Sequence, residues 1–211
     1  MKVTRITGGP LPTNCYLLTD EVTGQTAVID PGFENSELKD ALNAVGLQNV
    51  RMILLTHGHF DHIMGAVRVK KLTDANIFIY SDDMMFTADN SLNLSNMMLP
   101  TPMQPFTADQ PLNDGDTVHL GELTIRTMHT PGHTIGSCCY RAENAIFTGD
   151  TLMKGSCGRT DFPTGSYPQI LQSLKKLKEL DGDYHIYPGH GNETTLDYER
   201  KHNPYLESNA L

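Results

Sequence analysis

The sequence predicts a single α/β domain over residues 1–211, and three observations lead to this prediction. Short apolar runs that suit strands alternate along the chain with segments whose apolar residues have helical spacing. A length of 211 residues suits one compact domain. The hydrophobic fraction of 38% and the charged fraction of 19% are those of an ordinary globular protein. We therefore expect layers of sheet and helix around a buried core.

The first half of the chain is expected to hold four strands and two helices. Short apolar runs predict the strands, at residues 15–18, 26–29, 50–55 and 77–80. Helices are predicted at residues 35–45, whose apolar positions have helical spacing, and at residues 61–71. The strand at 26–29 ends at Asp30-Pro31-Gly32, a sequence that strongly favours a turn.

The second half repeats this alternation. Strands are predicted at residues 117–120, 123–128, 137–141, 145–148 and 183–187. Helices are predicted at residues 167–180 and 194–202.

The segment 89–113 does not fit the alternation, because it contains four prolines and three methionines. Loops of that length are usually functional or disordered. We expect a lid or a wall of the substrate site there. The alternative is a surface connection that packs on itself.

Composition excludes some classes of function. A formal net charge of −9 repels nucleic-acid phosphates, so we expect no nucleic-acid partner and a small-molecule substrate instead. The N-terminal residues lack an apolar run of signal-peptide length, and no stretch approaches the ~20 apolar residues that span a bilayer. We therefore expect a cytoplasmic protein without a membrane partner.

The four cysteines do not indicate a zinc ribbon or a thioredoxin-like site, because none of them lies in a C-x-x-C pair. They are interpreted as free thiols in a reducing cytosol. Cys138 and Cys139 are adjacent, so they are expected to point to opposite faces of one strand.

Most of the chemistry is predicted from the segment His57-Gly58-His59-Phe60-Asp61-His62, which lies between a predicted strand and a predicted helix. Three imidazoles and one carboxylate within six residues are too many polar groups to bury without partners. Imidazole nitrogens and carboxylate oxygens are suitable ligands for zinc, iron or manganese. His57 and His59 share a face in extended backbone, whereas Asp61 and His62 lie at the turn into the helix. One segment can therefore contribute ligands to two neighbouring metal ions.

Three other turns carry a His or an Asp directly after a predicted strand. Their residues are His133 in Thr130–Thr134, Asp150 in Phe147–Thr151 and His190 in Tyr187–Gly191. Ligands of open α/β sheets tend to bind at such strand ends. With the first segment they give five histidines and two aspartates, enough for two metal ions.

The other histidines lack this context and are interpreted as structural or surface residues: His119, His129, His185 and His202.

Together these residues resemble the metallo-β-lactamase superfamily, whose hallmark is H-x-H-x-D-H followed by His, Asp and His ligands. The resemblance implies a four-layer αββα sandwich of two mixed β-sheets flanked by helices. It also implies the roles of the site residues. The first metal would be held by His57, His59 and His133, and the second by Asp61, His62 and His190. Asp150 would bridge the two metals, and Asp30 would support the site from behind the ligands.

Within that superfamily the chain is similar to type II glyoxalases, the hydroxyacylglutathione hydrolases. This likeness rests on Gly149–Leu152 and Gly155–Arg159. It implies that Arg159 binds an anionic part of the substrate, since a guanidinium forms two parallel hydrogen bonds with a carboxylate. An ordinary structural ion pair is the alternative role for Arg159.

Two departures from the glyoxalase pattern weaken the expectation of glutathione as substrate. Only 21 residues follow His190, so the helical C-terminal domain of those enzymes is not expected. Asp161 stands where those enzymes have a tyrosine that contacts the substrate.

The resemblance implies hydrolysis of a thioester by a metal-bound hydroxide, with catalytic roles for Asp61 and Asp150 and with two divalent metals, zinc before iron or manganese. The run Cys157–Phe162 also resembles persulfide dioxygenases, which use one iron. That activity is the main alternative. Hydrolysis of a lactone or a β-lactam is a second alternative, and a non-catalytic metal-binding protein is a third.

Overall fold

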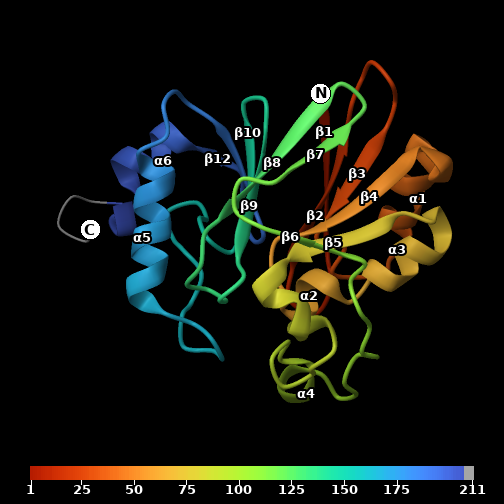
Figure 1. Cartoon of the computed structure of the whole chain (residues 1–211), viewed down its shortest axis with the longest axis horizontal. Helices are drawn as coiled ribbons and strands as arrows, with labels where there is room; N and C mark the ends of the chain where they lie inside the picture. Colours follow the sequence, from red (N-terminus) through yellow and green to blue (C-terminus); the bar gives the residue numbers. More distant parts are fainter. Residues whose placement is uncertain (207–211) are drawn as a thin grey trace.

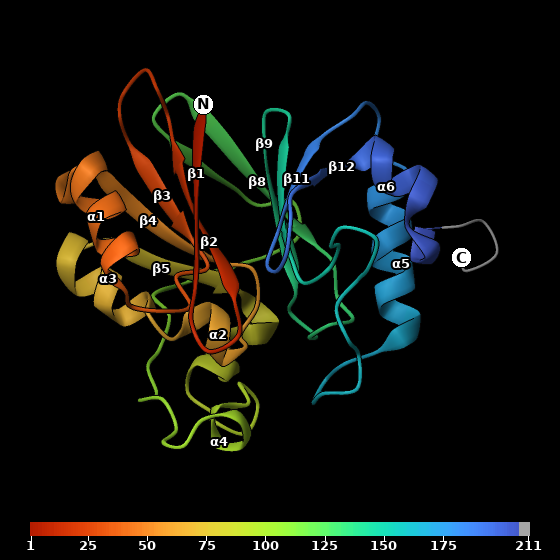
Figure 2. The ribbon, with the colours of Figure 1, turned by 180° about the vertical axis from the view of Figure 1, so that it is seen from behind.

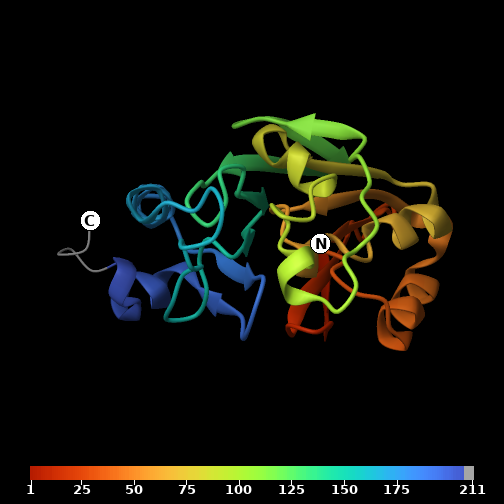
Figure 3. The ribbon, with the colours of Figure 1, turned by 90° about the horizontal axis from the view of Figure 1, so that it is seen from below.

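The structure is a computed structural model that describes residues 1–206. Two six-stranded sheets form the middle of the molecule, and helices cover the outer side of each (Figures 1 and 2). Seen from below, the two helical layers lie on opposite sides of the molecule (Figure 3). The expected αββα sandwich is thus confirmed. Residues 207–211 of the predicted domain lie outside the described residues.

The first sheet has the strand order β1-β2-β3-β4-β5-β6. Its strands are β1 (Lys2–Gly8), β2 (Thr13–Thr19), β3 (Thr26–Ile29), β4 (Val50–Leu55), β5 (Asn76–Tyr80) and β6 (Gln110–Leu112). The first three strands pair antiparallel, and the pairs from β3 to β6 are parallel. The parallel part places the carboxyl ends of its strands at one edge of the sheet.

The second sheet has the strand order β12-β11-β10-β9-β8-β7. Its strands are β7 (Thr117–Leu120), β8 (Leu123–His129), β9 (Cys138–Ala142), β10 (Ala145–Gly149), β11 (His185–Pro188) and β12 (Thr194–Thr195). Only β10 and β11 pair in parallel, so both of these strands end at the same edge.

The helices differ in length and position. The α-helices are α1 (Ser36–Val45), α2 (Phe60–Ile63), α3 (Ala66–Thr73), α4 (Ser95–Met98), α5 (Tyr167–Lys178) and α6 (Leu196–His202). The 3₁₀ helices are η1 (Leu47–Asn49), η2 (Ser81–Thr87) and η3 (Pro204–Leu206). Helices α1 and α3 cover the first sheet, and α5 and α6 cover the second (Figure 1).

Alternation along the strands divides the core into three layers. In β2, Tyr16 and Leu18 pack between the two sheets, whereas Leu17 packs toward the outer helices. In β9, Cys138 faces the layer between the sheets and Cys139 faces α5. The expectation that these two cysteines point to opposite faces is confirmed. Burial on both faces holds the register of β2 and β9, because a slip of one residue would exchange the two layers.

The structure corrects the predicted helix at 61–71, which is two helices with a break at Gly65. The amide of Gly65 donates to the carbonyl of Pro31, at 2.8 Å. A Cβ atom on Gly65 would lie 2.5 Å from the carbonyl oxygen of Phe33, so no larger residue fits. The turn after β3 therefore presses against the chain where a continuous helix was expected.

Three further differences concern short elements. Strand β1 was not predicted, because its only large apolar residues are Val3 and Ile6, which give neither an apolar run nor a strict alternation. The segment 89–113 contains α4 and β6 rather than an uninterrupted loop. The predicted helix at 194–202 begins at Leu196, because residues 194–195 pair with β11 and the Thr195 side chain caps the helix.

Candidate metal centre

Four segments that are distant in the sequence meet where strands of both sheets end. Residues 57–62 follow β4, residues 130–137 follow β8, Asp150 follows β10 and His190 follows β11. The structure brings together all seven of the predicted ligands, in three overlapping groups of potential metal ligands. The expectation that these strand ends share one site is therefore met.

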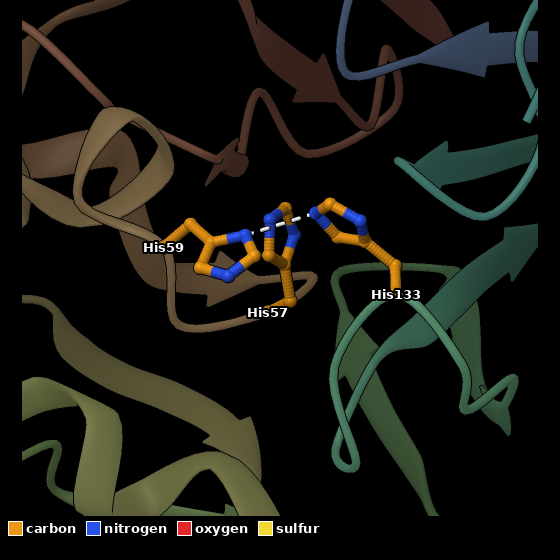
Figure 4. Close-up of side chains that lie close together, drawn as sticks. All are labelled: His57, His59 and His133. Carbon is orange, nitrogen blue, oxygen red and sulfur yellow. Dashed lines mark hydrogen bonds between the residues drawn. The ribbon is translucent and has the colours of Figure 1, made fainter. Parts of the chain in front are cut away.

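The first ligand group consists of His57, His59 and His133, which are almost completely buried. Figure 4 shows the three rings turned toward one another, with His133 approaching from the opposite side to the other two. Nδ1 of His59 lies 2.9 Å from Nε2 of His133. Nδ1 of His133 donates to the carbonyl of Arg159, at 2.7 Å, and this leaves its Nε2 free to face the site.

The second ligand group consists of Asp61, His62 and His190. Nε2 of His190 lies 3.2 Å from Oδ2 of Asp61 and 3.3 Å from Nε2 of His62. Nδ1 of His190 donates to the carbonyl of Pro12, at 2.9 Å. That hydrogen bond fixes the ring so that the opposite nitrogen points at the other members of the group.

Asp150 lies between the two groups. Its Oδ2 is 3.4 Å from Nε2 of His133 and 3.6 Å from Nε2 of His190. Its Oδ1 is 3.5 Å from Nε2 of His62. Asp150 is thus the residue that touches histidines of both groups, which is the position expected of a bridging carboxylate.

Two buried ligand atoms without hydrogen-bond partners indicate that the site suits bound metal ions. Nε2 of His57 and Oδ1 of Asp150 are buried and have no hydrogen-bond partner among residues 1–206. A buried polar atom without a partner costs about 1–3 kcal/mol. Imidazole nitrogen and carboxylate oxygen are ligands that zinc, iron and manganese accept, so a cation would satisfy both atoms.

The two groups differ in charge. Burial lowers the pKa of His57 and of His59 well below the usual histidine value, and the neighbouring imidazoles lower each of them further. Burial also favours neutral His62, but Asp61, Asp150 and Asp30 raise the pKa of His62 to about 10. The first group therefore offers neutral imidazoles, and the second contains a histidine that carries a proton among carboxylates.

Asp30 supports the second group. It has a φ angle of +50°, and its carboxylate accepts hydrogen bonds from the amide and the hydroxyl of Thr56, both at 2.7 Å. Nδ1 of His62 donates to Oδ2 of Asp30 at 2.9 Å, so Nε2 of that ring is aimed into the site. Asp30 thus lies behind a ligand, as expected.

Asn14 and Tyr16 hold the last segment in place. The Asn14 amide donates to Gly189, at 2.7 Å, and its side chain donates to the carbonyls of Pro188 and Gly191, at 3.0 and 2.9 Å. The Tyr16 hydroxyl donates to Pro188 at 2.7 Å. Strand β2 of the first sheet therefore positions the loop that carries His190.

Close packing also restricts this loop. A Cβ atom at Gly189 would lie 2.3 Å from Oδ1 of Asp150 and 2.6 Å from Cε1 of His62. The glycine of the Pro-Gly-His sequence is therefore required for space. Neither Asn14 nor Gly189 was singled out as a site residue from the sequence.

Sequence reasoning also missed Asp83, a fully buried carboxylate in η2. It accepts hydrogen bonds from Gly58 and Thr134, which are neighbours of three predicted ligands. The available signal was its place just after the predicted strand 77–80, at the same edge as the other strand ends.

A cavity of about 410 Å³ opens above the two groups. Its apolar wall includes Leu11, Leu94, Met98, Met153 and Phe162. Two of these residues belong to the segment 89–113, so part of that segment forms a wall, as expected.

Arg159 lines the same cavity, but its guanidinium is already paired. It donates twice to the carboxylate of Asp161, at 2.6 Å each, and its Cζ lies 4.0 Å from the centre of the Phe162 ring. The side chains of Arg159 and Asp161 are both more than half exposed. An anionic substrate group would therefore have to compete with Asp161 for Arg159.

The four other histidines lie outside the three ligand groups found among residues 1–206, in keeping with their interpretation as structural or surface residues. Cys157 borders the cavity, and burial raises the pKa of its thiol to about 11. In the same described range, every helix is too short or too polar to cross a membrane.

Comparison with known proteins matches residues 8–190 to the model of the metallo-beta-lactamase superfamily. The chain belongs to the metallo-β-lactamase superfamily. Its match covers the whole of the candidate metal centre.

Individual proteins resemble the chain over nearly its full length. The hydroxyacylglutathione hydrolase GloC of Haemophilus influenzae is 33% identical, over 93% of this chain and 94% of GloC. The crystal structure of BLEG-1, named a B3 metallo-beta-lactamase, is 32% identical with a TM-score of 0.92, over 98% of this chain and 100% of that one. TTHA1623 in a di-iron-bound form is 31% identical with a TM-score of 0.81, over 96% and 100% of the two chains.

Proposed function

We propose that the protein is a metal-dependent hydrolase of thioesters, such as a hydroxyacylglutathione. One observation carries this proposal: two groups of ligands meet at Asp150 beneath a cavity with an apolar wall. Two divalent metal ions held there would lower the pKa of water from about 15.7 to about 7 and would polarise a carbonyl oxygen. Zinc is the metal that we favour, and the same ligands suit iron and manganese.

The side chains of the site have separate tasks in this proposal. Oδ2 of Asp150 faces histidines of both ligand groups and Oδ1 faces the second group, so Asp150 is suited to orienting the attacking water. Burial would raise the pKa of Asp61, but His62 and His190 hold it well below its usual range. Asp61 therefore stays ionised at neutral pH. Leu94 and Phe162 lie in the apolar wall of the cavity, where they would reduce the access of bulk water to a bound substrate.

A thioester agrees with the absence of an obvious proton donor in the described cavity wall. Apart from the ligands, its ionisable groups are Arg159 and the Cys157 thiol, and a raised pKa makes that thiol a weak acid. A thiol leaving group has a pKa of about 8.5 and departs as a thiolate without help. An amine or alcohol leaving group would require a proton. The similarity to GloC supports the same substrate class.

Two measurements on the purified protein test the proposal. Elemental analysis should give two metal ions per chain, and S-lactoylglutathione should release thiol at a rate that chelation abolishes. One iron per chain together with oxygen uptake on glutathione persulfide would instead support the dioxygenase. Turnover of a β-lactam or a lactone without thioester cleavage would also overturn the proposed substrate class.

A further inference from the structure

Asp83 is a buried carboxylate that the proposed reaction does not use. It is fully buried in η2 and accepts three hydrogen bonds. Its Oδ2 accepts from the amide of Gly58 at 2.9 Å and from the hydroxyl of Thr134 at 2.7 Å. Its Oδ1 accepts from the amide of Gly136 at 2.7 Å. All three donors belong to the two segments that carry the first ligand group.

The donors lie directly beside the ligands. Gly58 separates His57 from His59, and Thr134 follows His133. One carboxylate oxygen thus accepts from both segments, so it connects the loop after β4 with the loop between β8 and β9. These loops come from different sheets, and the hydrogen bonds of Asp83 join them directly behind the three histidines.

Packing shows how closely the second loop rests on this carboxylate. A Cβ atom on Gly136 would lie 2.6 Å from Oδ1 of Asp83. The Thr134 hydroxyl also lies 2.7 Å from the Ser137 hydroxyl, which accepts from the Thr134 amide at 2.9 Å. The loop carrying His133 therefore rests on Asp83 at two positions, Thr134 and Gly136.

Burial of the Asp83 carboxylate costs free energy, so its presence here needs a structural reason. Burial of an ionised group without a paired cation disfavours its charged form. Burial raises the pKa of Asp83 to about 6, against the hydrogen bonds from Thr134, Gly136 and Gly58. An apolar side chain would fill the space without this penalty, but it would leave three donors without an acceptor.

Asp30 gives a comparison within the same site. Asp30 contacts a ligand directly, through Nδ1 of His62, and supports the second group. Asp83 contacts only the neighbours of ligands and supports the first group.

We propose that Asp83 is a positioning residue for the first metal, because it holds the His57–His59 segment against the His133 loop. The inference rests on the metal-binding part of the proposed function and is independent of the substrate. Asp83→Asn keeps the size of the side chain but replaces one acceptor oxygen with a donor. That donor would face at least one of the three groups that now donate to Asp83. Loss of a residue that supports the metal ligands from behind typically lowers metal affinity about 10–100-fold.

The test is a titration of chelator-treated protein with Zn²⁺ in competition with a chromophoric chelator. His133→Ala identifies the binding step of the first group, and His190→Ala identifies that of the second. Asp83→Asn should weaken the first step about 10–100-fold and leave the second within about twofold. Asp82→Asn is the matched control, since Asp82 is the exposed neighbour in η2, and it should change neither step.

The melting temperature of metal-free Asp83→Asn shows whether this variant still folds. If Asp83→Asn weakens both steps equally, or neither, the inference is overturned. If that variant does not fold, Thr134→Val decides, because it removes one donor and keeps the shape of the side chain. A weaker first step alone in Thr134→Val supports the inference, and any other result overturns it. Failure of thioester cleavage with intact Zn²⁺ binding would overturn the proposed substrate but not the role of Asp83.

Discussion

The two ligand groups of the metal centre share a location but differ in charge and exposure. The first group consists of three buried imidazoles whose pKa values are all lowered, chiefly by burial. The second group contains Asp61 and His62, and its third member, His190, has a side chain that is 26% exposed. Side chains a few ångströms apart therefore create one neutral, closed position and one charged, more open position. This difference predicts that the two metals bind with different pH dependence and leave at different rates.

The largest effect is expected from Asp150→Ala, because the carboxylate of this residue lies within 3.6 Å of histidines of both groups. Both metals should bind more weakly. Loss of a residue that only hydrogen-bonds to a metal ligand typically costs about 10–100-fold, so loss of Asp150 itself should lower activity by at least ~100-fold. Metal content after gel filtration and the rate of thioester cleavage measure the two effects. Normal metal content together with normal activity would show that Asp150 is not a metal ligand.

Replacement of one ligand in each group should separate the two positions. His190→Ala should lower the metal content from two ions to one, and His133→Ala should remove the other ion. Because His190 is the more exposed ligand, the wild-type protein should lose the metal of the second group first when a chelator is added. A single release phase, or loss of both ions in each variant, would show that the groups are not separable.

The pH dependence of metal binding should differ between the groups. The pKa of His62 is raised to about 10 without metal, so at neutral pH a metal must displace its proton. Affinity of the second group should therefore rise about tenfold per pH unit between pH 7 and 9. The first group has histidines with lowered pKa values, so its affinity should stay nearly flat over that range. Calorimetric titration with Zn²⁺ in two buffers of different ionisation enthalpy counts the released protons, and equal slopes for both steps would contradict this prediction.

The smallest effect is expected at the mouth of the cavity, outside both groups. The Arg159–Asp161 pair is exposed, and such pairs contribute only about 0–1 kcal/mol. Arg159→Ala should therefore hardly change the melting temperature, and it should raise KM for S-lactoylglutathione a few-fold at constant kcat. Asp161→Asn should lower that KM, since it frees the guanidinium for a substrate carboxylate. Unchanged KM values in both variants would exclude Arg159 from substrate binding.

Much of the centre could be predicted from the sequence because its ligands are concentrated. The 57–62 segment and the turns of His133, Asp150 and His190 each place a ligand type after a predicted strand, and strand ends converge in this class of fold. Asp83 could not be assigned in this way, because its role depends on contacts with Gly58 and Thr134, which are distant in the sequence.

Other features depend on tertiary contacts that a periodic pattern does not contain. The helix break at Gly65 arises because the backbone after β3 lies against it. The sequence leaves the role of Arg159 open between substrate binding and a structural ion pair, and only the structure shows that its guanidinium is paired with Asp161. Strand β1 has little apolar character of its own and forms by pairing with β2 along its full length.

The anchoring of the His190 loop on β2 has a consequence for biosynthesis. Asn14 and Pro188 are 174 positions apart, so the ribosome makes β2 long before the segment that it anchors. Until that segment emerges, a nascent chain has every imidazole of the first group but not His190. The seven ligand side chains can therefore come together only after His190 has been synthesised, and a chain that stops before residue 188 would leave its N-terminal hairpin without this docking partner.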